Sequence, residues 1–433
     1  MKVLLLGLGR ANIAVAEYLT ERGDDVYLYE DHPDRLSNRA RDIVDTGQVR
    51  EYTDTAYDLV VTSPGFPIDK PVIHRLADAN IPIIDEVEFT FRELKNPPVI
   101  AVSGTNGKST TVAIISTILR TAGFATFLGG NIAPGQPFST ALMHKPYEQY
   151  VLEVSSFQLM RIDTFRPHIA VLTNIATDHM NWHRDYNEYR HAKARLFMNQ
   201  NADDYAVLNG EDAGVRALAD ATKARVFFFG QDEKGGAWAN NNYHYRDEKI
   251  APLGTSRLEG RHNMMNMLAA IAVAKILDVE NKMIEKGIDS FNPLPHRLEE
   301  IGTFHGIRYI NNSMCTNENA AIASLEAITG NKVVIAGGRM KGDVGDRYLE
   351  KIVEHAKACV IFGSNADYIV RFFNIKSYTM FAIAENMEDA VSKARKFADA
   401  GDTIMLNPGY ASFDYFSDFL ERGEAFRNAA KQD

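Results

Sequence analysis

At 433 residues, the chain is long enough for two or three domains that each bury a core of their own. Its 45% hydrophobic and 24% charged residues are typical of an ordinary soluble globular protein. The formal net charge of −10 argues against a general nucleic-acid binder, because a phosphate backbone needs a basic face.

The cysteine count and the apolar runs indicate the compartment. Cys315 and Cys359 are too few for a disulfide framework or a thiolate metal site, which favours a reducing environment. No apolar run approaches the ~20 residues of a spanning helix, and Met1 leads into a strand-like segment rather than a signal peptide. We therefore expect a cytoplasmic protein that is not inserted in a membrane.

The first 93 residues alternate between strand and helix patterns. Strands are predicted at 3–6, 26–29, 59–62 and 81–84, and helices at 13–22 and 71–79. This alternation predicts a parallel sheet with ligands at the carboxyl ends of its strands.

The turn Gly7-Leu-Gly9 resembles the start of a dinucleotide-binding fingerprint. Asn12 occupies the position of the third glycine, and Glu30 lies about twenty residues further on, where an acid would bind a ribose. These residues fit an NAD site, a mononucleotide-type site or a turn needed only for packing, and all three interpretations stay open.

A proline-containing linker at 94–98 leads into a predicted phosphate-binding loop. The apolar run 98–102 is followed by Gly104-Thr-Asn-Gly-Lys-Ser109 and by a helical run to residue 119. Strand, glycine loop and helix are the context in which backbone amides and a helix N-terminus bind phosphate. Lys108 would contact the β- and γ-phosphates of ATP, and the Ser109 hydroxyl would bind Mg²⁺. The alternative is an ordinary Gly/Ser/Thr turn before a helix.

Further strands and helices follow in the same alternation. Strands are predicted at 150–154, 169–172, 205–208, 226–229, 309–310, 333–336, 360–363 and 404–406, and helices at 263–277, 317–328 and 413–431. The polar stretch 231–258 fits either hairpins or a loop, and 291–295 is a second proline-containing linker. The fold class is therefore α/β with three domains at 1–93, 98–294 and 295–433. They are predicted as a Rossmann-like domain, a central phosphate-loop mononucleotide-binding sheet and a second Rossmann-like domain.

Three ionisable side chains after the loop are candidates for metal chemistry. Glu153 lies at the end of an apolar strand, where phosphate-loop enzymes place an acid that holds Mg²⁺. His179 follows Asp178 after the next strand, and Lys193 lies on a helix. Taken alone, Glu153 also fits an exposed strand end, and Lys193 a solvated surface charge.

A set of motifs along nearly the whole chain resembles the Mur ligases of peptidoglycan synthesis. They are Gly104-Thr-Asn-Gly-Lys-Ser-Thr110, Gly129-Gly-Asn131, Glu153-Val-Ser-Ser-Phe-Gln-Leu159, Asp178-His-Met180, Gly260-Arg-His-Asn263, Pro295-His-Arg297, Asn311 to Asn317, and Asn407-Pro-Gly-Tyr-Ala-Ser-Phe-Asp414. Ser63-Pro-Gly65, Gly129-Gly-Asn131 and Ala411-Ser-Phe-Asp414 most resemble the branch that adds D-glutamate.

The resemblance implies an ATP-dependent peptide ligase of cell wall biogenesis. Such an enzyme phosphorylates a substrate carboxylate, and an amino acid then displaces phosphate from the acyl phosphate. ATP would be held by loop residues, by Asn263 and Asn266 at the adenine, by Arg297 at the phosphates and by Asn312 at the ribose; the loop residues are Gly104, Thr105, Asn106, Gly107, Lys108, Ser109 and Thr110. Two Mg²⁺ sites are implied, one on Ser109 and Glu153 and one on His179 and a carbamylated Lys193.

The resemblance also implies where the other substrates bind. The UDP-N-acetylmuramoyl precursor would contact Gly9, Arg10, Glu30, Ser63 and Gly65 with its nucleotide, and Asn131 with its sugar-peptide portion. The incoming amino acid would bind at Thr316, Lys341, Ser412 and Phe419. The enzyme is expected to act as a monomer.

The sequence departs from the D-glutamate-adding branch at several positions. That branch usually has Asp-Ser-Lys-Ala-Thr-Asn where this chain has Asn312-Ser-Met-Cys-Thr-Asn317, so an acid and a pocket lysine are replaced. The turn at Arg10-Ala-Asn12 and the residue Asn181 also differ. A Mur-like ligase with another acceptor or precursor is therefore the main alternative. A nicotinamide-dependent oxidoreductase and a non-catalytic nucleotide-binding regulator are further ones.

Overall fold

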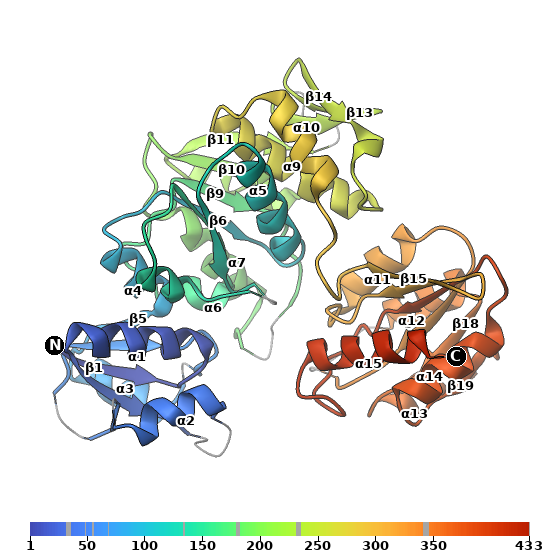
Figure 1. Ribbon diagram of the computed structural model, residues 1–433, viewed down its shortest axis with the longest axis horizontal. Helices are drawn as coiled ribbons and strands as arrows, with labels where there is room; N and C mark the ends of the chain where they lie inside the picture. Colours follow the sequence, from blue (N-terminus) through green and yellow to red (C-terminus); the bar gives the residue numbers. More distant parts are fainter. Residues whose placement is uncertain are drawn as a thin grey trace. The chain divides into compact units, whose positions relative to one another are not determined.

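The computed structural model describes residues 1–31, 36–47, 49–53, 56–67, 69–132, 135–178, 182–230, 235–340 and 346–432 (Figure 1). The chain forms two compact units, Met1–Thr255 with Met265–Ser290 and Ser256–Met264 with Phe291–Asp433. Three separate sheets, two of them in the first unit, confirm the α/β class. The predicted boundaries at 93, 98, 294 and 295 remain predictions.

The N-terminal sheet is fully parallel, with strand order β3-β2-β1-β4-β5. Its elements are β1 (Lys2–Leu6), α1 (Arg10–Arg22), β2 (Asp25–Tyr29), α2 (Asn38–Asp45), β3 (Arg50–Glu51), β4 (Leu59–Thr62), α3 (Pro71–Asp78), β5 (Ile83–Asp85) and α4 (Glu86–Glu93). The strand predicted at 81–84 begins later, at Ile83. The elements α2, β3 and α4 were not predicted. The strand β3 has only two residues, both exposed, and α4 buries two glutamates, so neither shows a clear apolar pattern.

The central sheet has nine strands in the order β14-β13-β12-β11-β10-β9-β6-β8-β7. Its strands are β6 (Val99–Ser103), β7 (Thr126–Gly130), β8 (Gln149–Glu153), β9 (Ile169–Leu172), β10 (Tyr205–Asn209), β11 (Arg225–Phe229), β12 (Ala237–Ala239), β13 (Asn242–Tyr245) and β14 (Glu248–Pro252). The last three form an antiparallel ribbon, which resolves the ambiguous stretch 231–258 in favour of hairpins for its described part.

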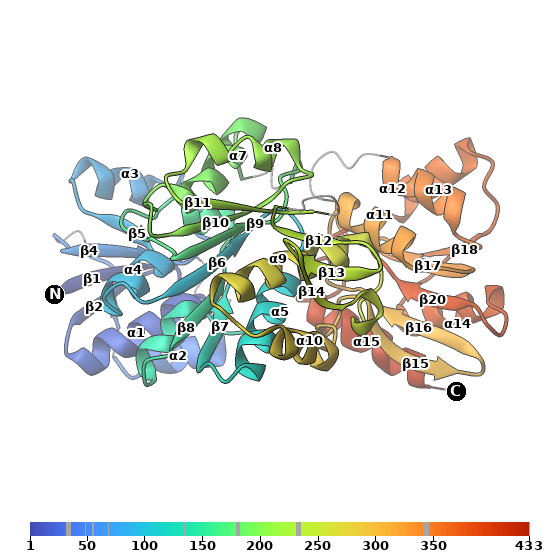
Figure 2. The same cartoon turned by 90° about the horizontal axis from the view of Figure 1, so that it is seen from above.

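Helices cover both faces of the central sheet. They are α5 (Lys108–Thr121), α6 (Ser156–Leu159), α7 (Tyr186–Ala194), α8 (Ala213–Arg216), α9 (Arg261–Ile276) and α10 (Asn281–Ser290). In Figure 2, α7 and α8 lie on one face and α5 and α10 on the other. The sheet places the ends of β6, β8 and β9 next to one another, because β6 pairs in parallel with both of the others.

The C-terminal sheet has the order β15-β16-β20-β17-β18-β19 and is parallel except for the β15–β16 pair. Its elements are β15 (Glu299–Phe304), β16 (Ile307–Asn311), α11 (Glu318–Ala327), β17 (Lys332–Ala336), α12 (Arg347–His355), β18 (Ala358–Ile361), α13 (Ala366–Ile375), β19 (Phe381–Ile383), α14 (Met387–Phe397), β20 (Thr403–Leu406) and α15 (Phe419–Lys431).

Two predictions for this part of the chain were wrong in their limits. The last helix begins at Phe419 rather than at Phe413, because Asp418 caps it by accepting a hydrogen bond from the Glu421 amide. The strand predicted at 360–363 ends at Ile361, because Gly363 adopts a φ of 136°.

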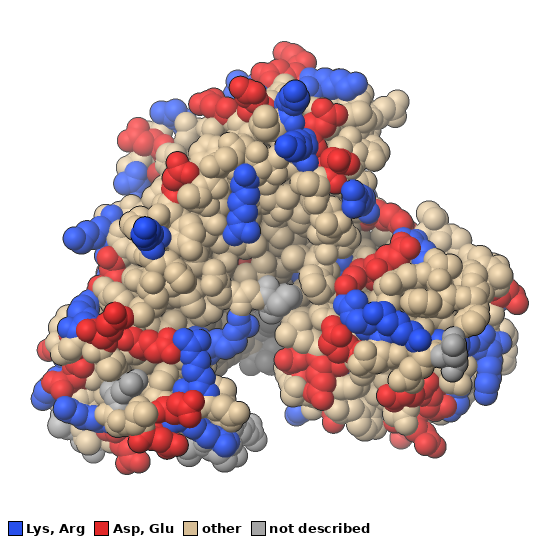
Figure 3. Space-filling view, viewed as in Figure 1, with Lys and Arg blue, Asp and Glu red and all other residues tan. Residues whose placement is uncertain are grey.

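The surface carries charges of both signs. On the face drawn in Figure 3, Lys and Arg side chains are interspersed with Asp and Glu side chains. Among the described residues, no helix has the length and apolar character needed to cross a bilayer.

A group of buried carboxyl groups lies at the junction of β5 and α4. Glu88 accepts hydrogen bonds from the amides of Asp163, Thr164 and Phe165. Burial alone would raise the pKa of Glu88, but these hydrogen bonds lower it overall. Asp85 and Glu86 are also fully buried and each keeps one carboxyl oxygen without a hydrogen-bond partner. Burial, reinforced by the neighbouring Glu86, raises the pKa of Asp85 to about 8, and burial raises the pKa of Glu86 to about 7.

We expect Asp85→Asn and Glu86→Gln to stabilise the protein more at pH 9 than at pH 6. In the unfolded chain these carboxyls ionise near their ordinary pKa values of 3.8 and 4.5, whereas in the folded protein they hold the proton to higher pH. Wild-type stability should therefore fall as pH rises from about 4 through the folded values. An amide keeps the acceptor oxygen without this titration, so the variant should gain about 1–3 kcal/mol over wild type between pH 6 and 9.

Urea unfolding at several pH values measures this difference. Glu285→Gln on α10 provides the control, because it makes the same kind of substitution at an exposed position. A pH-independent difference for both buried variants would mean that Asp85 and Glu86 ionise near their ordinary pKa values.

Candidate active site

The predicted phosphate loop connects the buried strand β6 to helix α5 and requires glycine at two positions. Gly104 has a φ of 148° and Gly107 a φ of 85°. A Cβ on Gly104 would lie 1.9 Å from Thr173 Oγ1, and one on Gly107 would lie 2.3 Å from Asn266 Oδ1. The loop therefore folds this tightly only with glycine at both positions, and α5 begins directly after it at Lys108.

Residues after β9 hold this loop in place. The Asn106 amide donates to Asn174 Oδ1 at 2.8 Å, and Asn174 Nδ2 donates back to the Asn106 carbonyl at 3.0 Å. Thr173 Oγ1 donates to the same carbonyl at 2.7 Å. Asn174 and Thr173 were not predicted as site residues, although both are polar and directly follow an apolar strand. Their contacts fix the backbone amides of the loop before any phosphate binds.

Lys108 lies over the loop that it follows. Its Nζ donates to the carbonyls of Gly104 at 2.9 Å and Thr105 at 2.8 Å. The ammonium group is thus held at the glycine loop, as expected for a lysine that contacts the phosphates of a nucleotide.

Ser109 and Glu153 meet as predicted from the motifs. Ser109 Oγ donates to Glu153 Oε2 at 2.6 Å, and Asn131 Nδ2 donates to Glu153 Oε1 at 3.4 Å. Glu153 is only 3% exposed, which excludes the alternative of a solvated strand end. A carboxylate and a hydroxyl at the end of a phosphate loop are oxygen donors of the kind that Mg²⁺ prefers.

Lys193 is buried beside the same loop. It is 1% exposed, its Nζ donates to the Gly104 carbonyl at 2.8 Å, and it lies 4.6 Å from the centre of the Tyr189 ring. Tyr189 Oη in turn lies 3.0 Å from Thr105 Oγ1. Burial and then the charge of Lys108 lower the pKa of Lys193 well below its usual value, although Asp178 and Glu153 act in the opposite direction. Lys193 is therefore not a solvated surface lysine.

Two predicted site residues, His179 and Lys341, lie outside the described residues. Within the described part of the chain, no group of three or more His, Cys, Asp or Glu residues could hold a metal ion. The predicted metal set has Glu153 as its one described acid, with Ser109 and Lys193 beside the same loop.

The predicted nucleotide residues of the N-terminal sheet gather at the ends of its strands. The Leu8 amide donates to Glu30 Oε2 at 3.0 Å, so Glu30 closes the turn after β1. A Cβ on Gly9 would lie 2.8 Å from Ser63 Oγ. Arg10 and Gly65 are exposed at this end of the sheet.

Asn12 has a structural role in this sheet. Its Nδ2 donates to the carbonyls of Leu6, Gly7 and Val61, and the residue is fully buried. The side chain thus joins β1 to β4 at the position where a dinucleotide fingerprint has its third glycine.

The predicted adenine residues lie on α9. Asn266 is 4% exposed, and its Oδ1 accepts a hydrogen bond from Thr111 Oγ1 at 3.3 Å. This side chain packs against Gly107 of the phosphate loop. Asn263 belongs to the second compact unit, where its Nδ2 donates to the Glu259 carbonyl at 2.8 Å.

In the second unit, Asn312 and Arg297 have defined partners. The side chain of Asn312 accepts a hydrogen bond at Oδ1 from the Leu298 backbone amide at 3.0 Å. Its Nδ2 donates to Asn407 Oδ1 at 2.8 Å. Arg297 places Nε and one terminal nitrogen 3.2 and 2.9 Å from Met314 Sδ. The methionine that replaces the expected lysine is therefore an acceptor for a guanidinium group, whereas a lysine there would repel it.

The predicted acceptor residues come from three segments of the second unit. Thr316 follows β16, Ser412 follows β20 and is 2% exposed, and Phe419 begins α15. β16 and β20 are parallel neighbours, so the segments after them emerge at one edge of the sheet.

Two protein-family models match segments of the chain. The Mur ligase middle domain matches residues 102–274, and the MurD-like N-terminal domain of Mur ligases matches residues 1–85. The chain is 35% identical to the UDP-N-acetylmuramoylalanine–D-glutamate ligase of Pelotomaculum thermopropionicum, over 98% of this chain and 96% of that protein. The ligase of the same name from Lactococcus lactis is 36% identical, over 99% and 97%. The chain belongs to the Mur ligase family.

Solved structures show the same fold at low sequence identity. The UDP-N-acetylmuramate-alanine ligase MurC of Thermotoga maritima has a TM-score of 0.63 at 19% identity, over 100% of this chain and 99% of that one. The MurF ligase of Thermotoga maritima in complex with ADP has a TM-score of 0.63 at 15% identity, over 95% and 97%. These Mur ligase neighbours confirm the predicted α/β architecture.

Membership of the Mur ligase family confirms the prediction of a ligase. It argues against the alternatives of a nicotinamide-dependent oxidoreductase and of a non-catalytic regulator.

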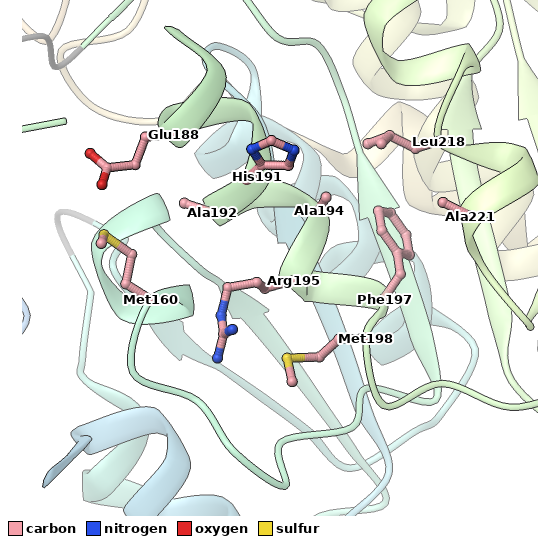
Figure 4. Close-up of a pocket in the computed structure, with 10 residues that line it drawn as sticks. All are labelled: Met160, Glu188, His191, Ala192, Ala194, Arg195, Phe197, Met198, Leu218 and Ala221. Atoms are coloured by element: carbon pink, nitrogen blue, oxygen red, sulfur yellow. The ribbon is translucent and has the colours of Figure 1, made fainter. Parts of the chain in front are cut away.

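A separate pocket in this Mur ligase adjoins the helix that carries Lys193 (Figure 4). Its cavity volume is about 500 Å³, and it is lined by Met160, Glu188, His191, Ala192, Ala194, Arg195, Phe197, Met198, Leu218 and Ala221. Arg195 donates to the carbonyls of Leu159 and Ile162, and Glu188 pairs with Arg184. Because these charged groups already have partners, we assign the pocket no ligand.

Proposed function

We propose that this Mur ligase joins D-glutamate to UDP-N-acetylmuramoyl-L-alanine, with conversion of ATP to ADP and phosphate. The observation that carries the ATP chemistry is the meeting of Lys108, Lys193 and the Ser109–Glu153 pair at one glycine loop. The identity of precursor and acceptor is supported by the relatives that carry this ligase name over nearly their whole length.

The reaction needs activation of a poor electrophile. A carboxylate resists attack by an amine, but transfer of the γ-phosphoryl group of ATP turns one of its oxygens into a leaving group. The amine nitrogen of the acceptor then forms the amide bond, and the carbon–oxygen bond to phosphate breaks. Because negative charge accumulates during the transfer, oriented amides and cations supply most of the catalysis.

The residues present fit ATP and Mg²⁺. Gly104 and Gly107 allow the tight loop that leads directly into the N-terminus of α5, and such a helix N-terminus is suited to bind phosphate oxygens. Ser109 and Glu153 would hold one Mg²⁺, which neutralises phosphate charge when bound. Lys108 would bind the β- and γ-phosphates, and Arg297, Asn263, Asn266 and Asn312 would complete the ATP site.

Lys193 is proposed to act as a carbamate. Its buried amine would add through nitrogen to the carbon of CO₂ and lose one proton, which replaces a cation with a bidentate anion. Together with His179, this anion would hold a second Mg²⁺. The burial of Lys193 without a carboxylate ion pair among the described residues supports this role, since a neutral amine is the reactive form.

The three predicted segments would divide the substrates. Residues 1–93 would bind the uridine nucleotide through Gly9, Arg10, Glu30, Ser63 and Gly65, and Asn131 would contact its sugar-peptide part. Residues 295–433 would bind the amino acid through Thr316, Lys341, Ser412 and Phe419.

We further propose that the enzyme works as a monomer in the cytoplasm. Two free, buried cysteines, Cys315 and Cys359, fit a reducing compartment. Light scattering during size-exclusion chromatography tests the monomer, and a dimer mass would overturn it.

A different amino-acid acceptor is the second candidate, because Met314 takes the place of a pocket lysine and is engaged by Arg297. Loss of one charge-assisted hydrogen bond weakens binding about ten- to hundredfold, so D-glutamate would bind less tightly than in relatives that keep the lysine.

Isotope exchange without an acceptor tests the first half of the reaction. The precursor is present, the amino acid is withheld, and the ATP carries ¹⁸O in its γ-phosphoryl group and in the β,γ-bridge. The bridging label should move into the non-bridging positions of the β-phosphate, because reversible acyl phosphate formation frees the β-phosphate of bound ADP to rotate. Omission of the precursor provides the control. A lack of precursor-dependent scrambling would count against the acyl phosphate.

Steady-state kinetics with D-glutamate, D-aspartate, L-glutamate and neutral amino acids test the second half. D-Glutamate should have the highest kcat/KM. If a neutral amino acid is best and D-glutamate is inactive at millimolar concentration, the proposed acceptor is wrong.

A further inference from the structure

The three segments with the predicted acceptor residues are joined by one buried side chain, Arg422 of α15. Arg422 Nε donates to Ser313 Oγ at 3.0 Å, and a terminal nitrogen donates to the Ser313 carbonyl at 2.8 Å. The other terminal nitrogen donates to the Tyr410 carbonyl at 3.1 Å. Ser313 lies three residues before Thr316, and Tyr410 lies two residues before Ser412.

Arg422 is linked to the third segment, which begins at Phe419, through the Ser313 hydroxyl. Ser313 Oγ accepts from Arg422 Nε and donates its own proton to the Phe419 carbonyl at 2.8 Å. A hydroxyl that accepts from a cation becomes a stronger donor, so the two hydrogen bonds reinforce each other. One guanidinium group thus sets the positions of the chain next to Thr316, Ser412 and Phe419.

The segment that leads toward Lys341 is hydrogen-bonded to the segment that carries Ser412. Arg339 and Ala411 exchange backbone hydrogen bonds of 2.8 and 3.1 Å. A Cβ on Gly338 would lie 2.3 Å from the Ala411 carbonyl and 3.2 Å from a terminal nitrogen of Arg422. The chain after β17 therefore packs directly on the guanidinium group.

Arg422 is buried without an acidic partner. It is 2% exposed, and its three hydrogen-bond acceptors are two carbonyls and a hydroxyl. Within the described residues it forms no ion pair, and Asp414 acts on it only through space. Burial lowers the pKa of Arg422 to about 10, so the group stays charged at neutral pH. A buried charge that no carboxylate neutralises is costly, and an anionic ligand nearby would offset that cost.

We propose that Arg422 is a positioning and specificity-determining residue of the acceptor site. Its hydrogen bonds fix the three segments, and its unneutralised charge makes the site select an acidic amino acid over a neutral one. This inference rests on the proposed function, since it takes Thr316, Ser412 and Phe419 as the acceptor residues. It also explains how a site with Met314 in place of a lysine can retain a preference for an acid.

Three variants separate the two roles of Arg422 in the full-length enzyme. Arg422→Gln removes the charge and part of the hydrogen bonding, and should raise KM for D-glutamate about ten- to hundredfold. It should also lower the preference for D-glutamate over D-glutamine about tenfold. Arg422→Lys keeps the charge and should retain the preference while KM rises. Ser313→Ala removes only the link through the Ser313 hydroxyl, and should raise KM without changing the preference.

Two measurements exclude general damage to the fold. The KM for ATP and the precursor-dependent isotope exchange without acceptor should change less than about twofold in all three variants. Arg427→Gln on the same helix is the matched control, because that guanidinium pairs with Glu299 and should leave the D-glutamate kinetics unchanged.

The outcomes are distinct. If the wild-type enzyme prefers a neutral amino acid, both the proposed acceptor and this inference fail. If wild type prefers D-glutamate but Arg422→Gln leaves both its KM and its preference unchanged, only the inference fails. If Arg422→Gln does not fold, Arg422→Lys and Ser313→Ala still decide, because an unchanged KM in both would overturn the positioning role.

Discussion

Replacement of Lys193 by alanine is expected to lower kcat roughly a hundredfold or more, a loss of about 3 kcal/mol of transition-state stabilisation. The reason is that the side chain is buried against Gly104 of the phosphate loop, where a carbamate would place an anion beside the phosphates and their metal ions. Lys193→Met fills the same space without an amine and should lose as much activity, which separates lost chemistry from a cavity.

The carbamate has readouts that do not depend on activity. In ¹³C-bicarbonate, wild type should show a carbamate carbonyl signal in its ¹³C NMR spectrum that is absent in Lys193→Met. Rigorous removal of CO₂ should slow wild type reversibly and leave the variants unaffected. Lys286→Ala on the exposed face of α10 is the control, and should change stability and rate little. A Lys193→Ala enzyme with wild-type turnover in bicarbonate-free buffer would refute the role.

The sequence was sufficient to predict the strands that form the centre of each sheet. Val99–Ser103 and Ile169–Leu172 are completely buried, and a strand buried on both faces shows as a continuous apolar run. The short β3 has two exposed residues and no such pattern. Phe413 and Tyr415 were misread as part of a helix because they are apolar, yet they are 58% and 59% exposed in the loop before α15.

The part of the site that could be predicted depends on neighbouring parallel strands. β6 and β8 end side by side, so the motifs after them had to meet, and Ser109 does contact Glu153. The contacts of Asn174 and Arg422 could not be predicted, because their partners lie 68 and 109 residues away and are chosen by tertiary packing. The burial of Lys193 was likewise invisible in a helix rich in charged residues.

Replacement of Gly104 by alanine is expected to lower kcat/KM for ATP by about a hundred- to a thousandfold. The added Cβ would lie 1.9 Å from Thr173 Oγ1 and 3.2 Å from the Asn174 amide nitrogen, so the loop must shift away from the residues that hold it. A displacement of about 1 Å at a catalytic site can cost a hundredfold in rate, and the φ of 148° adds strain for any L-residue. The loop also carries the carbonyl that accepts from Lys108 and Lys193, so both lysines would move with it.

Gly123, at the other end of α5, provides the matched control for this variant. It has a φ of 96° and nothing within 4 Å of its Cβ position, so Gly123→Ala has the backbone strain without the collision. We expect Gly123→Ala to lose about 1 kcal/mol of stability and to keep wild-type kinetics for ATP. Calorimetric titration with ADP and initial rates over a range of ATP concentrations measure both variants, with circular dichroism as the test of folding. Equal kinetics for the two variants would mean that the collision with Thr173, and hence the close fit of the glycine loop, has no part in nucleotide binding.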